Sequence, residues 1–324
     1  MNYKVSVIIP VYNVEKFVER CAHTLFAQTL KEVEFIFVDD CSPDNSINLI
    51  KDVSSLYPER SGHVRFLKHL KNKGLPAARN TGLAVAEGAY IFHCDSDDWV
   101  EETALEESFN FANEFNADLI WMDFYNSYPN REEYIIQENS SIKEDCIKNL
   151  LQEKLHGAVW NKLVKKELYV TNNIQFVEGC SMWEDLVVSI QLFNKADKVL
   201  YLNKGFYHYV QYNTEALSLM NLTKRLNELR SSCEFIINYL DREAVNRYVY
   251  EYNYLKLAAK QNLLFSKEKS SFLLWKTIYP ESNAYIMSFK ALPLHLRILG
   301  WCCEKNLKFI IQIYLFLKKI KNPA

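Results

Sequence analysis

The sequence contains few glycines, and none of them are spaced as in the common phosphate-binding loops. Only eight of the 324 residues are glycine, and no Gly-x-Gly occurs in the chain. This excludes the GxGxxG fingerprint of dinucleotide-binding proteins and the GxxxxGK[ST] phosphate loop. A nucleotide-dependent protein with this sequence needs another way to handle phosphate charge. A divalent cation held by carboxylates is the obvious one.

Metal-binding cysteine pairs, an excess of one charge and long apolar runs are also missing. The eight cysteines form no Cys-x-x-Cys, which argues against a zinc site or a disulfide framework. With 38 basic and 40 acidic residues the net charge is −2, so we expect no nucleic-acid partner. Apolar stretches such as residues 309–317 are far shorter than the roughly 20 residues of a membrane span. Residues 1–9 lack the pattern of a secretory signal, so we expect a cytoplasmic protein.

The first hundred residues alternate between two periodicities. Short apolar runs predict buried strands at residues 5–11, 33–38, 64–67 and 89–94. Helical spacing of apolar residues predicts helices at 14–28, 44–56 and 76–87. Strands separated by helices indicate βαβ units and a mostly parallel sheet flanked by helices, an α/β fold.

The pattern changes twice in the remainder of the chain. Another strand is predicted at residues 118–124, with shorter strands near 157–164, 198–202 and 206–211. Beyond residue 218 the apolar residues recur every three or four positions, which indicates amphipathic helices, and no strand is predicted. We therefore predict two domains, a catalytic α/β domain at 1–218 and a helical domain at 219–324.

The end of the chain is basic. Residues 285–324 carry seven Lys or Arg and one Glu, a net charge of +6, which leaves −8 for the rest. Within this region, residues 307–321 combine apolar side chains with four lysines. One interpretation is an interfacial helix held to anionic lipid. The other, with equal weight, is a terminal helix docked on its own domain with a solvated basic end.

Polar residues directly follow the predicted parallel strands, where ligands bind in open sheets of this kind. Asp95 and Asp97 leave a strand at alternate positions, so their carboxylates point the same way and suit Mn²⁺ or Mg²⁺. A simple turn explains the same residues, because Asp and Ser are common there. Asp40 similarly fits either a nucleobase contact or an Asx turn. Lys73 precedes a predicted helix and Arg79 lies in its first turns, where both could face a diphosphate. The alternative for Lys73 is a solvated loop charge.

Four segments together carry a resemblance to a known family. They are VSVIIPVYNVEKFVERCAHTLFAQTL, VEFIFVDDCSPDNS, NKGLPAARNTGLAVAEG and AYIFHCDSDDWV. In order and spacing they resemble the nucleotide-binding half of family-2 glycosyltransferases with the GT-A fold, of the bacterial polysaccharide-biosynthesis type. The resemblance implies an inverting, metal-assisted transferase. It also implies a UDP-hexose or UDP-N-acetylhexosamine donor, a glycan or lipid-linked acceptor, and a place on the inner face of the cell membrane.

The resemblance also implies roles for individual residues. The nucleotide and donor-sugar residues are Pro10, Val11, Tyr12, Asn13, Asp40, Lys73, Arg79, Asp95 and Ser96, and the metal ligand is Asp97.

Two further segments resemble the second half of the family's domain. HGAVWNKLVKKELY resembles a Trp-Asn-Lys segment common among bacterial members, which suggests Trp160 and Lys162 on the acceptor or donor side. MWEDL resembles the Glu-Asp motif of the family, which implies Asp185 as catalytic base beside Glu184. Acidic residues also favour a helix's first turn for purely structural reasons. Trp183 and His208 complete the weaker candidates.

One departure and two alternative functions remain. Relatives carry an Arg soon after an aromatic pair, whereas here Tyr207-His208-Tyr209 is followed by no Arg and a longer loop. Donor-sugar contacts of that region are therefore not carried over. A metal-dependent phosphohydrolase would need its Asp-x-Asp on an early strand, and here it follows the fourth. A non-catalytic nucleotide-sugar or glycan-binding protein that kept the fold is the other alternative.

Overall fold

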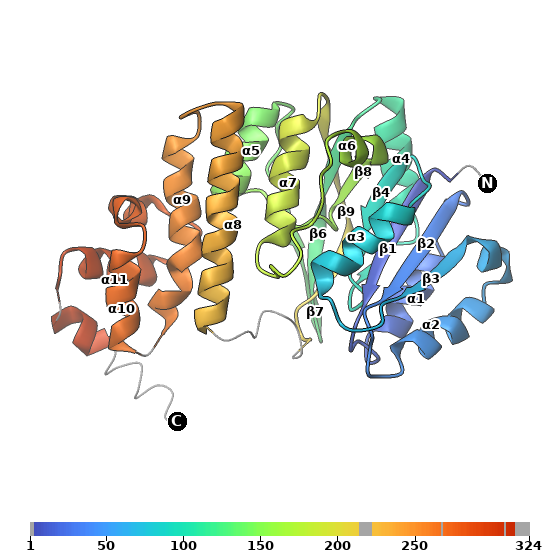
Figure 1. Ribbon diagram of the computed structural model, residues 1–324, viewed down its shortest axis with the longest axis horizontal. Helices are drawn as coiled ribbons and strands as arrows, with labels where there is room; N and C mark the ends of the chain where they lie inside the picture. The colour runs from blue at the N-terminus through green and yellow to red at the C-terminus, as the bar shows by residue number, and fades with distance from the viewer. Residues whose placement is uncertain (1–2, 214–221, 267, 308, 315–324) are drawn as a thin grey trace. The chain divides into compact units, whose positions relative to one another are not determined.

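A computed structural model describes residues 3–213, 222–266, 268–307 and 309–314 (Figure 1). The chain divides into two compact units, of which the first comprises residues 1–147 and 157–219 and the second 148–156 and 220–324. The short stretch 148–156 therefore groups with the second unit, although the predicted first domain included it. The predicted boundary after residue 218 lies outside the described residues, so it stays a prediction.

The first unit contains a mixed sheet. Its described strands are β1 (Val5–Val11), β2 (Val33–Asp39), β3 (Val64–Lys68), β4 (Tyr90–His93), β5 (Trp99–Val100), β6 (Leu119–Tyr128), β7 (Arg131–Ile135), β8 (Lys162–Lys165) and β9 (Val199–Val210). Their order is β3-β2-β1-β4-β8-β6-β9-β5, with β7 paired to β6. The first four strands run parallel, β8 is antiparallel to β4 and β6, and β9 is parallel to β6. This confirms the predicted α/β class.

Helices connect the strands, as their spacing predicts. They are α1 (Val18–Phe26), α2 (Ser46–Ser55), α3 (Leu75–Val85), α4 (Ala104–Glu114), α5 (Lys143–Leu151), α6 (Lys166–Thr171) and α7 (Glu184–Lys195), with a 3₁₀ turn η1 at Pro58–His63. Helix α3 begins after Gly74, whose φ of 90° suits glycine, and Pro76 stands in its first turn. Helix α7 begins with two acidic residues, which favour the positive end of the helix dipole.

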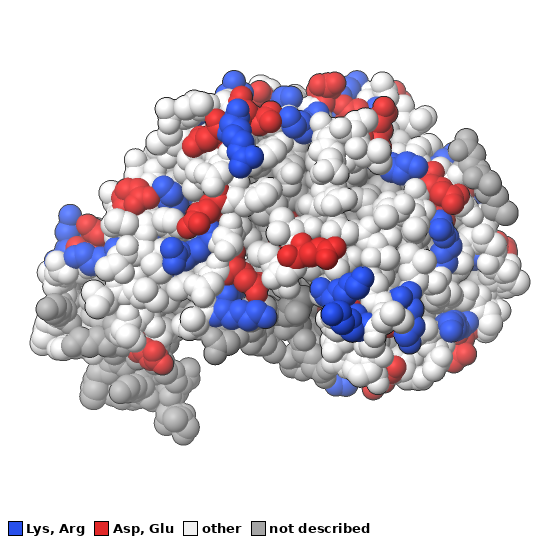
Figure 2. Space-filling model, viewed as in Figure 1, with Lys and Arg blue, Asp and Glu red and all other residues white. Residues whose placement is uncertain are grey.

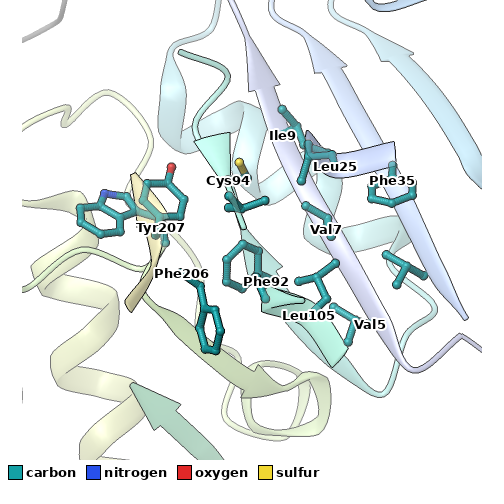
Figure 3. Packing of buried hydrophobic residues seen from close by; sticks show 14 of the residues in the cluster. Val5, Val7, Ile9, Leu25, Phe35, Phe92, Cys94, Leu105, Phe206 and Tyr207 are labelled. Carbon is teal, nitrogen blue, oxygen red and sulfur yellow. The ribbon is translucent and has the colours of Figure 1, made fainter. Parts of the chain in front are cut away.

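The core of the first unit lies against both faces of β1 and β2, all of whose residues are buried. Such complete burial explains why these strands read as continuous apolar runs instead of alternating ones. Figure 3 shows part of this core, with Val5, Val7 and Ile9 of β1, Phe35 of β2, Phe92 and Cys94 near β4, Leu25 of α1, Leu105 of α4, and Phe206 and Tyr207 of β9.

Gly88, just before β4, allows a close approach to β1. A Cβ there would lie 2.5 Å from the backbone nitrogen of Ser6. The Gly88 N–H also donates to Ser6 Oγ at 2.7 Å. A side chain at this position would therefore push β4 away from its register with β1.

The structure differs from the predicted elements in three places. Residues 157–161 are a turn, so β8 begins at Lys162 and is shorter than predicted. The two strands predicted at 198–202 and 206–211 are one strand, β9. Met122 of β6 pairs with Leu202, and the next residue of β6 pairs with Gly205. The two polar residues 203 and 204 therefore form a β-bulge within β9. Strands β5 and β7 were not predicted, because one has two residues and the other is mostly exposed and polar.

The second unit is helical in its described residues, as predicted. Its elements are α8 (Leu222–Glu243), α9 (Val249–Lys260), η3 (Gln261–Phe265), α10 (Lys269–Thr277), η4 (Pro280–Ser288) and α11 (Leu294–Glu304). Helix α8 buries Leu226, Leu229, Cys233, Ile236 and Leu240, which confirms the predicted amphipathic face.

Two surface predictions concern charge and membrane contact. Figure 2 shows Lys and Arg interspersed with Asp and Glu in small groups, as the balanced charge suggests. Across the described residues, no helix combines the length and the apolar character that crossing a membrane requires. The basic segment 307–321 includes residues 308 and 315–321, which lie outside the described part. Neither interpretation of that segment is therefore tested.

Candidate active site

The predicted site residues come together at the carboxyl ends of the parallel strands. Residues 10–11 end β1 and residues 12–13 follow it, Asp40 follows β2, and the segment 95–98 follows β4. Because β1 lies between β2 and β4 in parallel register, these three segments share one edge of the sheet. The basic loop 69–74, which leads into α3, lies at the same edge. The His69 N–H at its start donates to the Asp39 carbonyl at the end of β2.

Asp40 organises the loop that leads into α3. Its Oδ1 accepts hydrogen bonds from His69 Nδ1 at 2.6 Å and from the Lys73 N–H at 2.8 Å, and its Oδ2 accepts from the Gly74 N–H at 2.7 Å. His69 Nε2 in turn lies 2.9 Å from Thr81 Oγ1. No local sequence pattern indicates this role of His69. A nucleobase contact of Asp40 stays a prediction.

The segment predicted to hold the nucleobase is exposed where it leaves β1. Pro10 and Val11 are buried in the strand, whereas Tyr12 is 46% exposed. Asn13 adopts a left-handed backbone with φ of 54°, and its N–H donates to Ser42 Oγ at 2.9 Å. Tyr12 is therefore about half exposed at this edge, and its contact with a nucleobase stays a prediction. The Lys73 side chain is likewise exposed at this edge.

Arg79 of α3 joins the two predicted acidic motifs. Its Nη2 donates to Asp95 Oδ1 at 2.7 Å, while its Nη1 pairs with Asp185 and lies 3.5 Å from Glu184 Oε1. The Arg79 side chain is 1% exposed, and its guanidinium lies 5.3 Å from the centre of the Phe176 ring. The sequence placed Arg79 near a diphosphate, whereas in the structure three carboxylates surround it. Phosphate binding by Arg79 stays a prediction.

The carboxylates in this cluster have different proton affinities. Burial and repulsion from Asp185 together raise the pKa of Glu184 to about 8, against the attraction of Arg79. Burial also raises the pKa of Asp185, which Arg79 opposes. Asp185 keeps 17% of its side chain exposed, and its Oδ2 accepts the Val159 N–H at 3.2 Å. Asp185 is thus an oriented and partly exposed carboxylate, and its role as catalytic base stays a prediction.

Glu184 makes stability depend on pH. Its pKa is raised in the folded chain, so between pH 4.5 and 8 the folded state retains a proton that the unfolded state releases. The free energy of unfolding should therefore fall as pH rises through this window. Glu184→Gln removes that titration. We expect the free energy of unfolding of the variant, taken relative to that of the wild type, to be roughly 1–3 kcal/mol higher at pH 8 than at pH 5. Urea unfolding of both proteins between pH 5 and 9 measures the difference.

The control is Glu178→Gln, which changes an exposed carboxylate on the segment before α7. It should leave the pH dependence of the wild type unchanged. An identical pH dependence of the wild type and Glu184→Gln would show that Glu184 is ionised throughout the range.

Strand β9 holds the Asp-x-Asp segment in place. The Tyr207 hydroxyl accepts the Asp95 N–H at 3.0 Å and donates to Asp98 Oδ2 at 2.7 Å. Asp98 Oδ1 accepts the Val210 N–H, and Asp97 Oδ2 accepts from Asn213 Nδ2, both at 2.7 Å. The roles of Tyr207 and Asp98 in holding this segment could not be predicted from the sequence, because their hydrogen-bond partners lie more than a hundred residues away.

Asp97 fits a divalent cation that also binds phosphate. Burial and the neighbouring Asp95 carboxylate raise the pKa of Asp97, so a cation there would relieve both effects. Ser96, between them, is buried. Within the described part of the chain, no group of three or more His, Cys, Asp or Glu is arranged to hold an ion. One or two carboxylates suffice, however, when a substrate's phosphates supply the other ligands.

The weaker candidates lie deeper than the sequence suggested. Trp160 is buried and stacks on Tyr207, with ring centroids 4.4 Å apart. His208 is buried too, with its ring nitrogens 2.7 Å from Glu132 and 2.9 Å from Glu101. A ligand-binding role for these two residues stays a prediction.

Trp183 and Lys162 flank the predicted base from two sides. Trp183 has a left-handed backbone with φ of 62°, a costly conformation for a bulky residue, directly before α7. Lys162 is 1% exposed, and its Nζ donates to the Ala158 carbonyl at 2.5 Å. Both residues shape the surroundings of Asp185, and a contact of either with a ligand stays a prediction.

The chain is similar to known proteins in sequence. The family model described as glycosyl transferase family 2 matches residues 6–170. An uncharacterized glycosyltransferase of Bacillus subtilis, EpsJ, is 32% identical over 212 residues, which are 63% of this chain and 60% of that protein. The chain thus spans about 60% of the length of this curated relative.

Solved structures share the fold. Staphylococcus aureus TarS 1–349 in complex with UDP superposes with a TM-score of 0.62 at 21% identity, covering 93% of this chain and 87% of that one. The mannosyltransferase PcManGT from Pyrobaculum calidifontis, in complex with GDP-Man and Mn²⁺, gives 0.55 at 13% identity, covering 94% and 86%. At these identities the likeness concerns the fold alone, and it confirms the predicted GT-A architecture.

Proposed function

Since the chain belongs to glycosyl transferase family 2, we propose that it transfers a sugar from a nucleotide-activated donor to an acceptor hydroxyl, with inversion at the anomeric carbon. The observation that carries the proposal is the guanidinium of Arg79. It bonds Asp95 of the predicted donor segment and Asp185, the predicted base, although the two lie 90 positions apart in the sequence. A donor bound at the first would present its sugar to a nucleophile activated by the second.

The reaction we propose is a single in-line displacement. The acceptor oxygen attacks the anomeric carbon while the bond from that carbon to the diphosphate oxygen breaks. Asp185 takes the proton of the acceptor hydroxyl, for which its orientation by Arg79 and the Val159 N–H prepares it. Glu184, whose pKa burial raises to about 8, carries a proton at neutral pH and limits the negative charge beside the base. No covalent intermediate with the protein is needed.

Asp97 would hold a divalent cation, Mn²⁺ or Mg²⁺, together with the donor's phosphates. Such an ion, when bound, neutralises charge on the departing diphosphate. The Asn213 amide orients the Asp97 carboxylate, and the Tyr207 hydroxyl fixes the backbone before it. The Mn²⁺ bound to PcManGT supports this assignment. Asp95 and Ser96 would face the ribose or the donor sugar.

UDP is the nucleotide we propose, because TarS binds it on the same fold. Tyr12 would stack on the base at the exposed end of β1, with Asn13 beside it. We propose a glycan or a lipid-linked acceptor, and a place in the cytoplasm at the inner face of the membrane. That choice rests on the family's bacterial members and on the basic end of the chain.

Calorimetric titration with UDP, with and without Mn²⁺, tests the donor site. We expect Mn²⁺ to strengthen UDP binding to the wild type, and Asp97→Ala to abolish the enhancement. The control Asp52→Ala changes an exposed carboxylate on α2 and should bind like the wild type. UDP-sugars are then screened as donors. The readout is the release of UDP, which both sugar transfer and slow hydrolysis of the donor produce.

Each other outcome removes a part of the proposal. Equal UDP binding with and without Mn²⁺ would exclude Asp97 as a metal ligand. No binding of UDP would exclude a UDP-sugar donor. UDP-sugar binding without transfer or hydrolysis would leave the non-catalytic binding protein as the better description.

A further inference from the structure

A single peptide group connects Lys162 to Asp185. The carbonyl oxygen of the Ala158–Val159 peptide accepts a hydrogen bond from Lys162 Nζ at 2.5 Å. The N–H of the same peptide donates to Asp185 Oδ2 at 3.2 Å. The carbonyl and the N–H of one peptide are coupled by resonance, so a charge on one side affects the other.

The turn that carries this peptide is fixed in the fold. The Lys162 N–H donates to the Val159 carbonyl at 3.2 Å, which closes the turn before β8. Lys162 Nζ also donates to Asn161 Oδ1 at 2.9 Å, and Asn161 Nδ2 donates to the Met122 carbonyl of β6 at 3.0 Å. The ammonium is thus held by the sheet itself, and the peptide keeps one orientation toward Asp185.

A buried ammonium in such a place is expensive. Lys162 is 1% exposed, and transferring a charge from water to the interior destabilises a fold unless the charge is compensated. A methionine has similar length and volume without that penalty. The retention of a cation here therefore calls for a role beyond packing.

We propose that Lys162 is a positioning residue for Asp185, acting through the Ala158–Val159 peptide. Its ammonium draws electron density from the peptide carbonyl, which makes the Val159 N–H a stronger donor to the Asp185 carboxylate. The stronger hydrogen bond holds that carboxylate ionised and oriented. The inference rests on the proposed function, in which Asp185 accepts the proton of the acceptor hydroxyl.

The charges around both ends set the conditions for a test. The groups that act on Asp185 are Arg79, Asp95, Glu184 and Lys162, together with the tyrosines Tyr169 and Tyr209. Those that act on Lys162 are Asp185 and Cys146. Burial lowers the pKa of Lys162 to about 7, so its ammonium form prevails below that pH. The Val159 amide shifts of the variants are therefore compared at pH 6.

The test uses NMR of the full chain without any donor. Selective ¹⁵N-valine labelling reports the Val159 amide, assigned with Val159→Ile, and ¹³C labelling of aspartate reports the Asp185 carboxyl, assigned with Asp185→Asn. In Lys162→Met we expect the Val159 amide proton to move upfield and the pKa of Asp185 to rise by about 1 unit. Lys162→Gln keeps a donor but no charge, and we expect the same two changes.

The matched control is Lys165→Met, in the same strand. Lys165 pairs with Asp118 at 2.8 Å, away from the turn, so both signals should stay at their wild-type positions. Should the Lys162 variants fail to fold, the wild type still provides the test. Its Val159 amide shift should change with an inflection near pH 7 as Lys162 loses its proton.

Kinetics separate this inference from the proposed function. In the active enzyme, the acid limb of the kcat/KM profile should move up by about 1 pH unit in Lys162→Met. Wild-type signals in Lys162→Gln would overturn the inference, since the hydrogen bond and not the charge would then hold the peptide. A wild-type pKa of the Asp185 carboxyl in an active Lys162→Met variant would also overturn the inference. Absence of transfer by the wild type refutes the proposed function alone, because the NMR shifts do not depend on it.

Discussion

Asp185→Asn should lower kcat for sugar transfer by about 10²–10⁴-fold while UDP binding changes little. The amide oxygen of Asn still accepts the Val159 N–H, and the side chain keeps its volume, so the local structure is retained. Asn cannot take a proton from the acceptor hydroxyl, so the activation of the nucleophile is lost, along with the charge that Asp185 presents to Arg79. Steady-state transfer rates and calorimetry with UDP on the same samples measure the two effects separately.

Asp197→Asn is the matched control for this experiment. It makes the same chemical change in an exposed residue just beyond the other end of α7. Its transfer rate should equal that of the wild type. Normal transfer by Asp185→Asn would remove Asp185 from the role of base. A parallel loss of UDP binding would instead assign Asp185 to the donor site.

Arg79→Met should lower the free energy of unfolding at pH 7 by about 3–5 kcal/mol, because it leaves buried carboxylates without their cation. Asp95, Glu184 and Asp185 all bond to this guanidinium, and the Arg79 side chain is almost completely buried. The remaining carboxylates should take up protons in response, so the loss should shrink as pH falls. Urea unfolding at pH 5 and pH 7 checks both statements.

Two further variants make the Arg79 result specific. Lys204→Met breaks an ion pair with Glu107 in which both side chains are exposed, and such pairs contribute less than about 1 kcal/mol. Adding Asp185→Asn to Arg79→Met removes one of the unpaired charges and should restore part of the stability. If Arg79→Met unfolds like the wild type, the carboxylates are already protonated or solvated in the fold.

The parallel half of the sheet could be predicted from the sequence because its strands are buried on both faces. The predicted run 5–11 coincides with β1, and residues 33–38 differ from β2 by one residue. The carboxyl ends of these strands then placed Asp40, Asp95 and Asp97 at one edge. The Asp-x-Asp and Glu-Asp segments were found by resemblance, since acidic residues at a strand end or helix start have ordinary structural explanations.

The sequence could not reveal which side chains meet. Arg79 lies 106 positions from Asp185, and nothing local distinguishes it from a solvated arginine or a phosphate ligand. The single strand β9 was predicted as two, because its bulge at residues 203–204 resembles a turn. Trp160 and Lys162 were predicted on the acceptor or donor side, and that role stays a prediction. Their burial, which makes them part of the scaffold, depends on β9 and the turn before β8.

The support of the Asp-x-Asp segment by β9 has a consequence for the order of folding. All four parallel strands are complete by residue 93, so that half of the sheet can form while the ribosome still synthesises the rest. The contacts from Tyr207, Val210 and Asn213 to this segment span 109 to 116 residues, and contacts of such separation form slowly. A nascent chain that ends before residue 213 therefore has the strands of the donor site without its finished loop. In the proposed function, nucleotide affinity should therefore arise late in synthesis, after β9 has paired with β6.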